Sequence, residues 1–491
     1  MRAKGLAAGV GTLLFVIPIS LILPLITGFL YGESPLLILS AYGLPFIFAG
    51  LVGLLLVKWG GPLGDDLRPI EALSIVSIFW LLLALFGALP YMIIGSIPDF
   101  VSALFESMSG FTTTGSSVIS DVDGQARSIL MWRSETQWIG GVGVVVLVVA
   151  LLSQVLGGHK AGFQLMKSEV PGHSHERIVP RLRDSAKVVI SVYLILTFLQ
   201  TILLVIFGLT LYDAVNHTFT TLATGGFGTH TASIGYYKDF AWAPVIELIF
   251  IAFMIFGSVN FVLHYNLMKG DLRSYFRDLE FRVYIFFWLF FVGIVAIDLW
   301  ANRMYSGGES LRASLFNVTS IISTTGYATE DFDRWPDLSR FIMLAAMMMG
   351  GMTGSTSGAI KTARFIIVGK ALRRTVRKIG HPRAHIPVRA GGMVISEDIV
   401  RGVALFIFAY VSIFAFSSFL MTMTGLDIVE ALSAVATTMG GVGPGLNSIG
   451  PAMNFASVSD VGKIILSILM WIGRLELITC FVLISPSSYK T

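Results

Sequence analysis

Residues 105–117 read FESMSGFTTTGSS, a segment too short to cross a membrane as a helix, followed by a turn of Thr, Gly and Ser. The chain builds such a turn four times, each between a half-length helical segment and a full apolar one. The turns read FTTTGSS at 111–117, TLATGGF at 221–227, ISTTGYA at 322–328 and GGVGPGL at 440–446. Four carbonyl-rich turns can surround one axis and replace the water around an ion. The repeat therefore predicts a cation pore made from one polypeptide.

The composition places this pore in a membrane. Of the 491 residues 55% are hydrophobic and 13% are charged, too few to cover a soluble globule with polar surface. Apolar segments long enough to span a membrane as helices predict an all-α integral membrane fold with ten spans. These lie at about 7–30, 36–57, 70–95, 128–153, 184–211, 242–266, 281–301, 340–368, 397–424 and 460–484.

The repeat predicts how the chain is divided. Residues 1–60 form an N-terminal pair of transmembrane helices, 61–156 form pore repeat 1, and 157–267 form a cytoplasmic loop and pore repeat 2. Residues 268–369 form pore repeat 3 with a broken second span, and 370–491 form a cytoplasmic loop and pore repeat 4. Each repeat runs span, short segment, turn, span, and the short segments lie at 99–112, 213–223, 311–323 and 427–439. They are expected to enter the membrane and return.

Basic residues orient the chain, because cytoplasmic loops carry an excess of Lys and Arg. Three loops hold them: Lys160, Lys167, Arg177, Arg181, Arg183 and Lys187 after the fourth span, Lys269, Arg273, Arg277 and Arg282 after the sixth, and Lys370, Arg373, Arg374, Arg377, Lys378, Arg383 and Arg389 after the eighth. The pattern predicts a protein of the plasma membrane with both termini on the cytoplasmic side. All four turns are then expected to face outward. The same basic residues can attract anionic lipid headgroups or a cytosolic partner. Because they lie in loops between spans, they do not indicate nucleic-acid binding.

The second spans repeat as well. Each carries a glycine in an apolar stretch, at Gly140, Gly257, Gly350 and Gly473. A tight helix–helix contact also favours small residues, and this is the alternative. Four copies in one context instead favour re-entrant turns. Such turns are tolerated at membrane depth only where they are buried in protein or line a water-filled path. The turns contain no Asp or Glu, so carbonyls and hydroxyls remain as ligands, which suits a monovalent cation better than calcium.

Several longer motifs resemble one family. FESMSGFTTTGSS, WRSETQWIGGVG (132–143), EVPG followed by PRLRDSAK, NFVLHY (260–265), GGMTGSTSGAIK (350–361) and GRLEL (473–477) are similar to the TrkH family of the Trk/Ktr/HKT superfamily of cation transporters. The resemblance covers about 60–485. It implies four span–pore-loop–span units around one central pore, with two extra N-terminal spans, and a filter in which a glycine in each turn goes with potassium selectivity.

The resemblance and the turns together predict a potassium-binding filter. Its residues are Thr113, Thr114, Gly115, Ser116, Ala223, Thr224, Gly225, Gly226, Thr324, Thr325, Gly326, Tyr327, Val442, Gly443, Pro444 and Gly445. The filter glycines are expected to be Gly115, Gly225, Gly326 and Gly443, and a serine in the first position would have favoured sodium. Val442 and Pro444 depart from the threonine pattern, so the ring is expected to be only pseudo-fourfold.

Gating is predicted below the filter. The stretch 350–358 carries more glycine and hydroxyl than a helix interior readily accepts, and by resemblance it is the family's gating loop; a flexible, closely packed kink is the alternative. Arg474 lies in an apolar span, where an ionised side chain is costly, and by resemblance it is an electrostatic barrier in the pore; the alternative is a packing role, for which Glu476 is a poor partner. The predicted gating residues are Gly350, Gly351, Gly354, Ser355, Thr356, Ser357, Gly358, Lys361 and Arg474.

Three further charged residues have two interpretations each. Lys361 either positions the loop or extends towards the cytoplasmic surface, and the second is slightly favoured. Glu106 and Asp99 either attract cations at the outer mouth or cap the pore helix, and capping is favoured for Asp99.

Other chemistry is weakly supported. The chain has no Walker-type phosphate loop, Thr356 stands where a nucleophile elbow needs serine, and the pairs His173/His175 and His381/His385 lack supporting metal ligands. Cys480 is expected to be inert packing. We therefore expect no enzyme and no cofactor, with potassium as the transported substrate.

The predicted function is potassium uptake, with the lipid bilayer, a homodimeric second copy and a cytosolic TrkA-like nucleotide-binding regulatory subunit as partners implied by the resemblance. A proton- or sodium-coupled potassium symporter is the alternative, since a broken span also suits a carrier. A membrane scaffold that transports nothing would tolerate bulky side chains in the turns.

Overall fold

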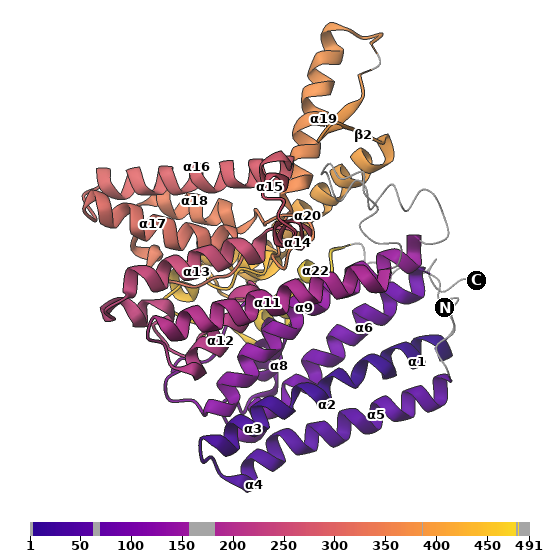
Figure 1. Ribbon diagram of the computed structural model, residues 1–491, viewed down its shortest axis with the longest axis vertical. Coiled ribbons are helices and arrows are strands. Elements are labelled where there is room, and N and C mark those ends of the chain that lie inside the picture. Colours follow the sequence, from indigo (N-terminus) through magenta and orange to yellow (C-terminus); the bar gives the residue numbers. More distant parts are fainter. Residues whose placement is uncertain (1–2, 62–68, 157–181, 385, 478–479, 481–491) are drawn as a thin grey trace.

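The computed structural model describes residues 3–61, 69–156, 182–384, 386–477 and 480, and it is almost entirely helical (Figure 1). The predicted all-α membrane fold is confirmed, apart from a short hairpin, β1 (Val388–Ala390) and β2 (Met393–Ile395). Gly391 and Gly392 join these strands with positive φ, as a tight two-residue hairpin turn requires. The basic residues Lys160, Lys167, Arg177 and Arg181, and the histidines His173, His175 and His385, lie outside the described residues.

The N-terminal pair packs as two antiparallel passages on one side of the molecule (Figure 1). The first consists of α1 (Ala3–Leu14), α2 (Val16–Ser20) and α3 (Ile22–Leu30), and the second of α4 (Pro35–Ile38), η1 (Leu39–Gly43) and α5 (Leu44–Gly60). Gly11 and Gly53 lie at the contact between α1 and α5, where an added Cβ on Gly11 would lie 2.8 Å from the Gly53 carbonyl oxygen. Small residues thus bring the two passages together.

The four repeats follow in order. Repeat 1 contains α6 (Pro69–Gly87), α7 (Leu89–Ile94), α8 (Phe100–Phe111) and α9 (Arg127–Leu156). Repeat 2 contains α11 (Leu182–Ile206), α12 (Leu211–Leu222), η2 (Ser233–Asp239), α13 (Ala243–Ser258) and α14 (Phe261–Met268), followed by α15 (Arg273–Arg277). Repeat 3 contains α16 (Leu279–Ala301), α17 (Gly307–Ile322), η3 (Phe332–Arg334), α18 (Asp337–Met347) and α19 (Thr362–Gly380). Repeat 4 contains α20 (Glu397–Met423), α21 (Ile428–Gly440), η4 (Asn447–Ile449) and α22 (Asp460–Arg474).

The ten predicted spans divide into two classes. Six described helical segments are long and apolar enough to cross a membrane: the two N-terminal passages and the first span of every repeat. Among the second spans, that of repeat 2 is bent, because α13 and α14 meet at an angle of 109°. Likewise α18 ends at Met347 and α19 begins only at Thr362, so the predicted span 340–368 is broken where the glycine-rich stretch lies.

The short helices α8, α12, α17 and α21 match the four predicted re-entrant segments, and each begins with the same device. A side-chain oxygen at the N-cap accepts the backbone N–H three residues later, and these caps are Asp99, Thr210, Ser306 and Asp427. In α17 and α21 a glutamate returns the bond and completes a capping box. The caps stabilise helices too short to persist alone.

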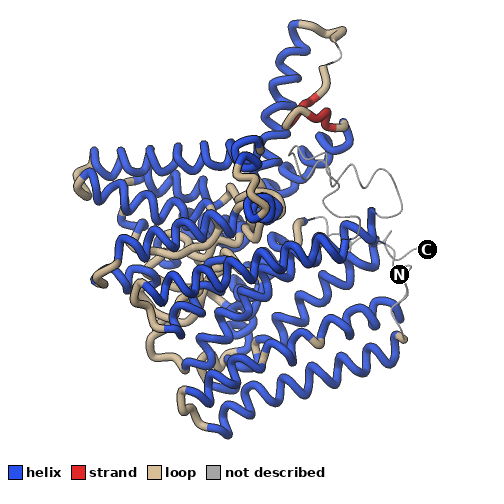
Figure 2. Tube along the Cα trace, in the orientation of Figure 1, coloured by secondary structure: helices blue, strands red, loops and turns tan. Residues whose placement is uncertain are grey.

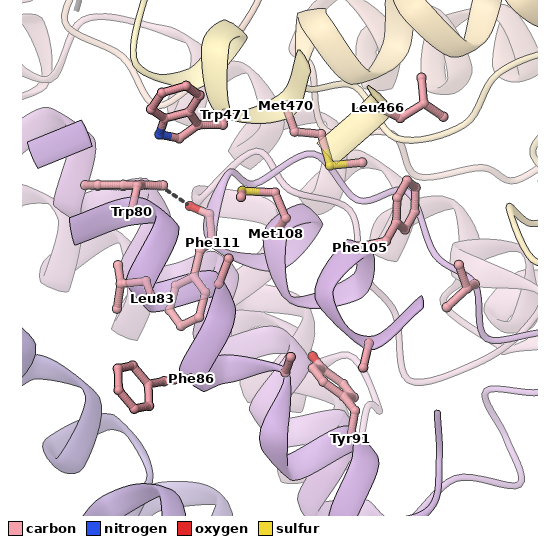
Figure 3. Packing of buried hydrophobic residues seen from close by; sticks show 14 of the residues in the cluster. Trp80, Leu83, Phe86, Tyr91, Phe105, Met108, Phe111, Leu466, Met470 and Trp471 are labelled. Atoms are coloured by element: carbon pink, nitrogen blue, oxygen red, sulfur yellow. Dashed lines mark hydrogen bonds between the residues drawn. The ribbon is translucent and has the colours of Figure 1, made fainter. Parts of the chain in front are cut away.

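The repeats close into a ring. The second span of each repeat packs against the short helix of the next: α9 against α12, α13 against α17, α18 against α21, and α22 against α8. Figure 3 shows the closing contact, where Met470 and Trp471 of α22 lie beside Met108 and Phe111 of α8. Non-helical chain lies within the helical bundle (Figure 2). This arrangement brings the four Thr/Gly turns together.

Candidate functional site: the turn ring and the intramembrane loop

The four turns share one backbone conformation directly after their short helices. In each, an N–H donates to the carbonyl five residues earlier, at 2.8 Å: Thr114 to Ser109, Gly225 to Thr220, Thr325 to Ser320 and Val442 to Thr437. The residue before each donor is left-handed, with φ of 53° at Thr113, 53° at Thr224, 60° at Thr324 and 66° at Gly441. Threonine rarely adopts this conformation, so its recurrence marks a constrained feature of the fold.

A glycine follows each donor, again with positive φ: Gly115, Gly226, Gly326 and Gly443. The prediction that Gly225 is the counterpart of Gly115 is therefore wrong by one residue. Gly225 occupies the position of Thr114, and Gly226 is the glycine equivalent to Gly115. The two adjacent glycines made the register ambiguous from sequence, and the hydrogen bond from Gly225 N–H resolves it.

These glycines touch one another's turns in cyclic order. A Cβ on Gly115 would lie 2.0 Å from the Gly225 carbonyl oxygen, one on Gly226 would lie 1.9 Å from that of Thr325, and one on Gly326 would lie 1.9 Å from that of Val442. The ring closes from Gly443 to the Thr114 carbonyl oxygen, at 3.1 Å. No side chain fits at the first three contacts, so glycine is required by space as well as by φ.

The fourth turn is the irregular one, as its sequence predicts. Its glycine has the largest clearance and a φ of 107°, compared with 79–84° in the other three. The hydroxyl of Ser116 crosses the ring boundary and donates to the Gly443 carbonyl at 2.7 Å. The ring is therefore pseudo-fourfold, and a side chain closes the junction where backbone contact is looser.

Buried side chains add to the bonds that hold the turns. The Gln137 side-chain amide donates to the Gly225 carbonyl at 2.7 Å, and its oxygen accepts the Phe227 N–H at 3.1 Å. The Tyr327 hydroxyl donates to the His217 carbonyl at 3.0 Å, and the Trp80 indole donates to the Phe111 carbonyl at 3.1 Å (Figure 3). Gln137 is not among the predicted site residues, although an amide within a span was the available signal.

The outer acids have different roles. Asp99 caps α8, and the Ser102 N–H that it accepts at 2.8 Å lowers the pKa of the Asp99 carboxyl. Glu106 is fully buried; it pairs with Arg133 at 2.9 Å and accepts the Val118 N–H at 2.8 Å. Glu106 therefore braces the chain behind the first turn and does not stand at the mouth as a free carboxylate.

The glycine-rich stretch 350–358 is a loop directly beneath the ring. Its ends are joined, because Gly350 N–H donates to the Ile360 carbonyl at 3.0 Å and Thr362 N–H to that of Gly351 at 3.1 Å. The loop also touches the ring region: Gly358 N–H donates to the Thr324 hydroxyl at 2.8 Å, and the Thr356 hydroxyl donates to the Leu222 carbonyl at 2.8 Å. The stretch is thus a loop held by contacts with other repeats, rather than the flexible kink of the alternative interpretation.

Arg474 joins the loop to α9 of the first repeat. Its guanidinium donates to the Thr356 carbonyl at 2.6 Å and to the Gly140 carbonyl in α9 at 3.1 Å. The side chain is buried, and among the described residues it forms no ion pair. Glu476 pairs instead with Arg364 at 2.5 Å, as expected from the poor geometry between residues two apart.

Lys361 departs from its favoured interpretation. Its ammonium donates to the Ser357 carbonyl, so it binds the loop and does not extend towards the surface. Among the described residues no group of three or more His, Cys, Asp or Glu side chains could hold a metal ion. Carbonyls, hydroxyls and the basic side chains of Lys361 and Arg474 are the polar groups of this region.

The sequence and the fold of this chain resemble those of known proteins. The family model for TrkH, described as a cation transport protein, matches residues 64–490. The chain belongs to the TrkH family of cation transport proteins. The predicted resemblance is confirmed, and with six or more apolar spans the protein is a multi-pass membrane protein.

Curated relatives match along the whole chain. The Trk system potassium uptake protein TrkH of Salmonella typhimurium is 34% identical over 100% of both chains, and that of Halomonas elongata is 36% identical over 87% of each. The crystal structure of the potassium transporter TrkH from Vibrio parahaemolyticus superposes with a TM-score of 0.88 at 30% identity, covering 100% of both chains. The fold of this TrkH-family chain is therefore that of a solved family member.

Proposed function

We propose that the protein carries potassium ions into the cell through the ring of four turns. The observation that carries the proposal is the closed cyclic contact of Gly115, Gly226, Gly326 and Gly443, which leaves carbonyl and hydroxyl oxygens to replace an ion's water. The C-terminal ends of α8, α12, α17 and α21 meet the turns, and the negative end of a helix dipole favours a cation. Relatives named for potassium uptake support the choice of ion.

Flow through the ring is proposed to be gated by the loop 350–358 and by Arg474. The loop lies between the ring and the cytoplasmic side assigned by the basic residues, and its middle is bonded to Arg474. A fixed positive charge in a poorly solvated path opposes a passing cation. The barrier is therefore proposed to combine obstruction by the loop with electrostatic repulsion.

Regulation and assembly complete the proposal. The protein is placed in the plasma membrane with both termini and all three basic loops in the cytoplasm. A homodimer and a cytosolic TrkA-like nucleotide-binding subunit are proposed as partners. The relatives' names, which refer to a Trk system, support a protein that works with other components.

Flux measured in liposomes tests the function. Purified protein should take up rubidium down its gradient and discriminate against sodium, because the ring offers ligands spaced by backbone geometry. The assay is run with and without a co-reconstituted regulatory subunit and with empty liposomes as the control. Absence of flux in both protein preparations would overturn the proposal.

A coupled symporter is the second candidate, and discontinuous helices favour it. The 109° bend between α13 and α14 and the break between α18 and α19 are features that many secondary transporters use at ion sites. Imposing proton and sodium gradients separately on the same liposomes separates the two. Rubidium flux that needs either gradient identifies a symporter, and flux along the rubidium gradient alone identifies a channel.

A further inference from the structure

Glu280 lies outside the loop and outside the ring, yet it bonds to Thr353 in the loop and to Ala363 at the start of α19. It is the second residue of α16, and its side chain is 1% exposed. Its Oε1 accepts the Thr353 N–H at 2.8 Å, the Thr353 hydroxyl at 3.2 Å and the Ala363 N–H at 3.0 Å. One carboxylate oxygen thus binds the entry of the loop and the first turn of α19.

The local structure fixes where that oxygen lies. Asp278 caps α16 by accepting the Phe281 N–H at 2.8 Å, which sets the start of the helix. One turn further along, the Tyr284 hydroxyl bonds to Ser258 Oγ at 2.8 Å, and the Ser258 carbonyl accepts the Met352 N–H at 2.8 Å. The first turns of α16 therefore support the loop entry directly through Glu280 and indirectly through Ser258.

Burying a carboxylate costs free energy unless hydrogen bonds compensate for the water that it loses. Among the described residues Glu280 forms no ion pair, and its bonded partners are two amides and a hydroxyl of one short segment. Hydrogen bonds to a charged acceptor are about twice as strong as neutral ones. The loop is thus bound more firmly by α16 than hydroxyl contacts alone would allow.

We propose that Glu280 is a positioning residue that holds the intramembrane loop closed beneath the ring. This inference rests on the proposed gating function. Glu280 acts through the loop and touches no transported ion. Because α16 follows the basic segment that contains α15, a displacement of the α16 start moves the carboxylate and breaks its bonds to Thr353 and Ala363 together.

The test uses the full-length protein in liposomes and compares Glu280→Ala and Glu280→Gln with the parent. The matched control is Glu33→Gln, which removes another carboxylate that accepts a backbone N–H, that of Ser128 at 2.9 Å, at the N-terminal pair. The parent for labelling carries Cys480→Ser and Ser355→Cys, because Ser355 is a buried loop residue. Two quantities are measured: rubidium flux, and the rate at which a charged methanethiosulfonate reagent modifies the introduced cysteine.

Glu280→Ala should raise the modification rate and the rubidium flux at least roughly tenfold, because it removes the charge-assisted bonds to Thr353 and Ala363. The ratio of rubidium to sodium uptake should stay unchanged, which a general loosening of the fold would not allow. Glu280→Gln should give a smaller increase, since its amide oxygen accepts weaker bonds. Glu33→Gln should match the parent.

Parental flux and parental modification rate in well-folded Glu280→Ala would overturn the proposal. If that variant does not fold, a parental modification rate in Glu280→Gln overturns it instead. The labelling result also separates this inference from the function itself. Faster labelling in a preparation that carries no rubidium supports the positioning role while counting against the proposed transport.

Discussion

The ring of turns and the loop beneath it are both non-helical chain inside a membrane, but they are held in different ways. The ring is maintained by backbone: internal N–H bonds, left-handed residues, and glycines that face the next turn's carbonyl with no room for a Cβ. The loop also contains close glycine contacts, at Gly350, Gly351 and Gly358, but several of its bonds come from polar partners in other elements, among them Glu280, Ser258, Thr324 and Arg474. Backbone packing resists adjustment, whereas polar side-chain contacts can be exchanged.

In the proposed function, this difference separates ion selection from gating. A structure with one sterically allowed arrangement suits a filter, because ligand positions must not vary. A structure held by replaceable bonds suits a gate, because two arrangements can lie close in free energy. Substitutions in the ring should change which ion passes, and substitutions around the loop should change how much passes.

The largest effect is expected for Gly115→Ser. The new Cβ would lie 2.0 Å from the Gly225 carbonyl oxygen, so that ligand must move. Discrimination of rubidium over sodium in liposome uptake should fall at least about tenfold, because carbonyl position governs selection. Gly293→Ser in α16, where a Cβ has open space, is the control. Unchanged discrimination in Gly115→Ser would remove the filter role of this contact.

Arg474→Ala should give the next largest change, now in flux. Loss of the guanidinium removes a buried positive charge and the bonds to Thr356 and Gly140. Rubidium flux should rise roughly tenfold with unchanged ion discrimination, which corresponds to removing about 1.4 kcal/mol of the barrier that the fixed positive charge presents to a cation. Arg474→Lys keeps the charge and serves as the comparison. Equal or lower flux in a well-folded Ala variant would favour a packing role.

Thr356→Val should release the loop in part. The substitution keeps shape but removes hydrogen bonds to the Leu222 and Gly257 carbonyls, at 2.8 and 2.9 Å. A rise in rubidium flux of about threefold to tenfold is expected from the loss of one or two such bonds. Thr375→Val, whose hydroxyl bonds only within exposed α19, should leave flux as it was. A change in ion discrimination without a change in flux would contradict the division between ring and loop.

Gly443→Ala should have the smallest effect among the ring glycines. Its Cβ would lie 3.1 Å from the Thr114 carbonyl oxygen, compared with 2.0 Å at Gly115. Strain from φ of 107° remains, so we expect a loss of discrimination of about twofold to threefold. The same uptake ratio measured for Gly115→Ala provides the comparison. A greater loss at Gly443 than at Gly115 would show that clearance does not rank these positions.

Much of this organisation was predictable from composition and repetition. Apolar segments of spanning length predicted the membrane fold, and four short segments before Thr/Gly turns predicted the four short helices that the structure contains. Asp99 was correctly predicted as a cap because its position before a short helix is a local signal. Arg474 and the break at 350–358 were found because charge and glycine are unusual in a span.

The sequence-based predictions were wrong where the role of a residue depends on its three-dimensional contacts. The two adjacent glycines at 225 and 226 cannot be ranked without the hydrogen bond that fixes the register of their turn. Lys361 was assigned to the surface because the sequence does not show which carbonyl lies within its reach. Glu280 was not singled out at all, since its partners are backbone groups more than seventy residues further along the chain.

The sequence by itself determined the helices, their caps and the fourfold repetition, because these follow from local hydrophobicity, spacing and residue type. Only the tertiary structure decided which glycine faces which carbonyl, how the ring closes between Gly443 and Thr114, and what holds the loop. The physical reason is that such contacts join segments distant in sequence, and they form only when those segments are positioned to within about a few tenths of an ångström. Residue types permit these contacts, and packing of the four repeats around one axis selects them.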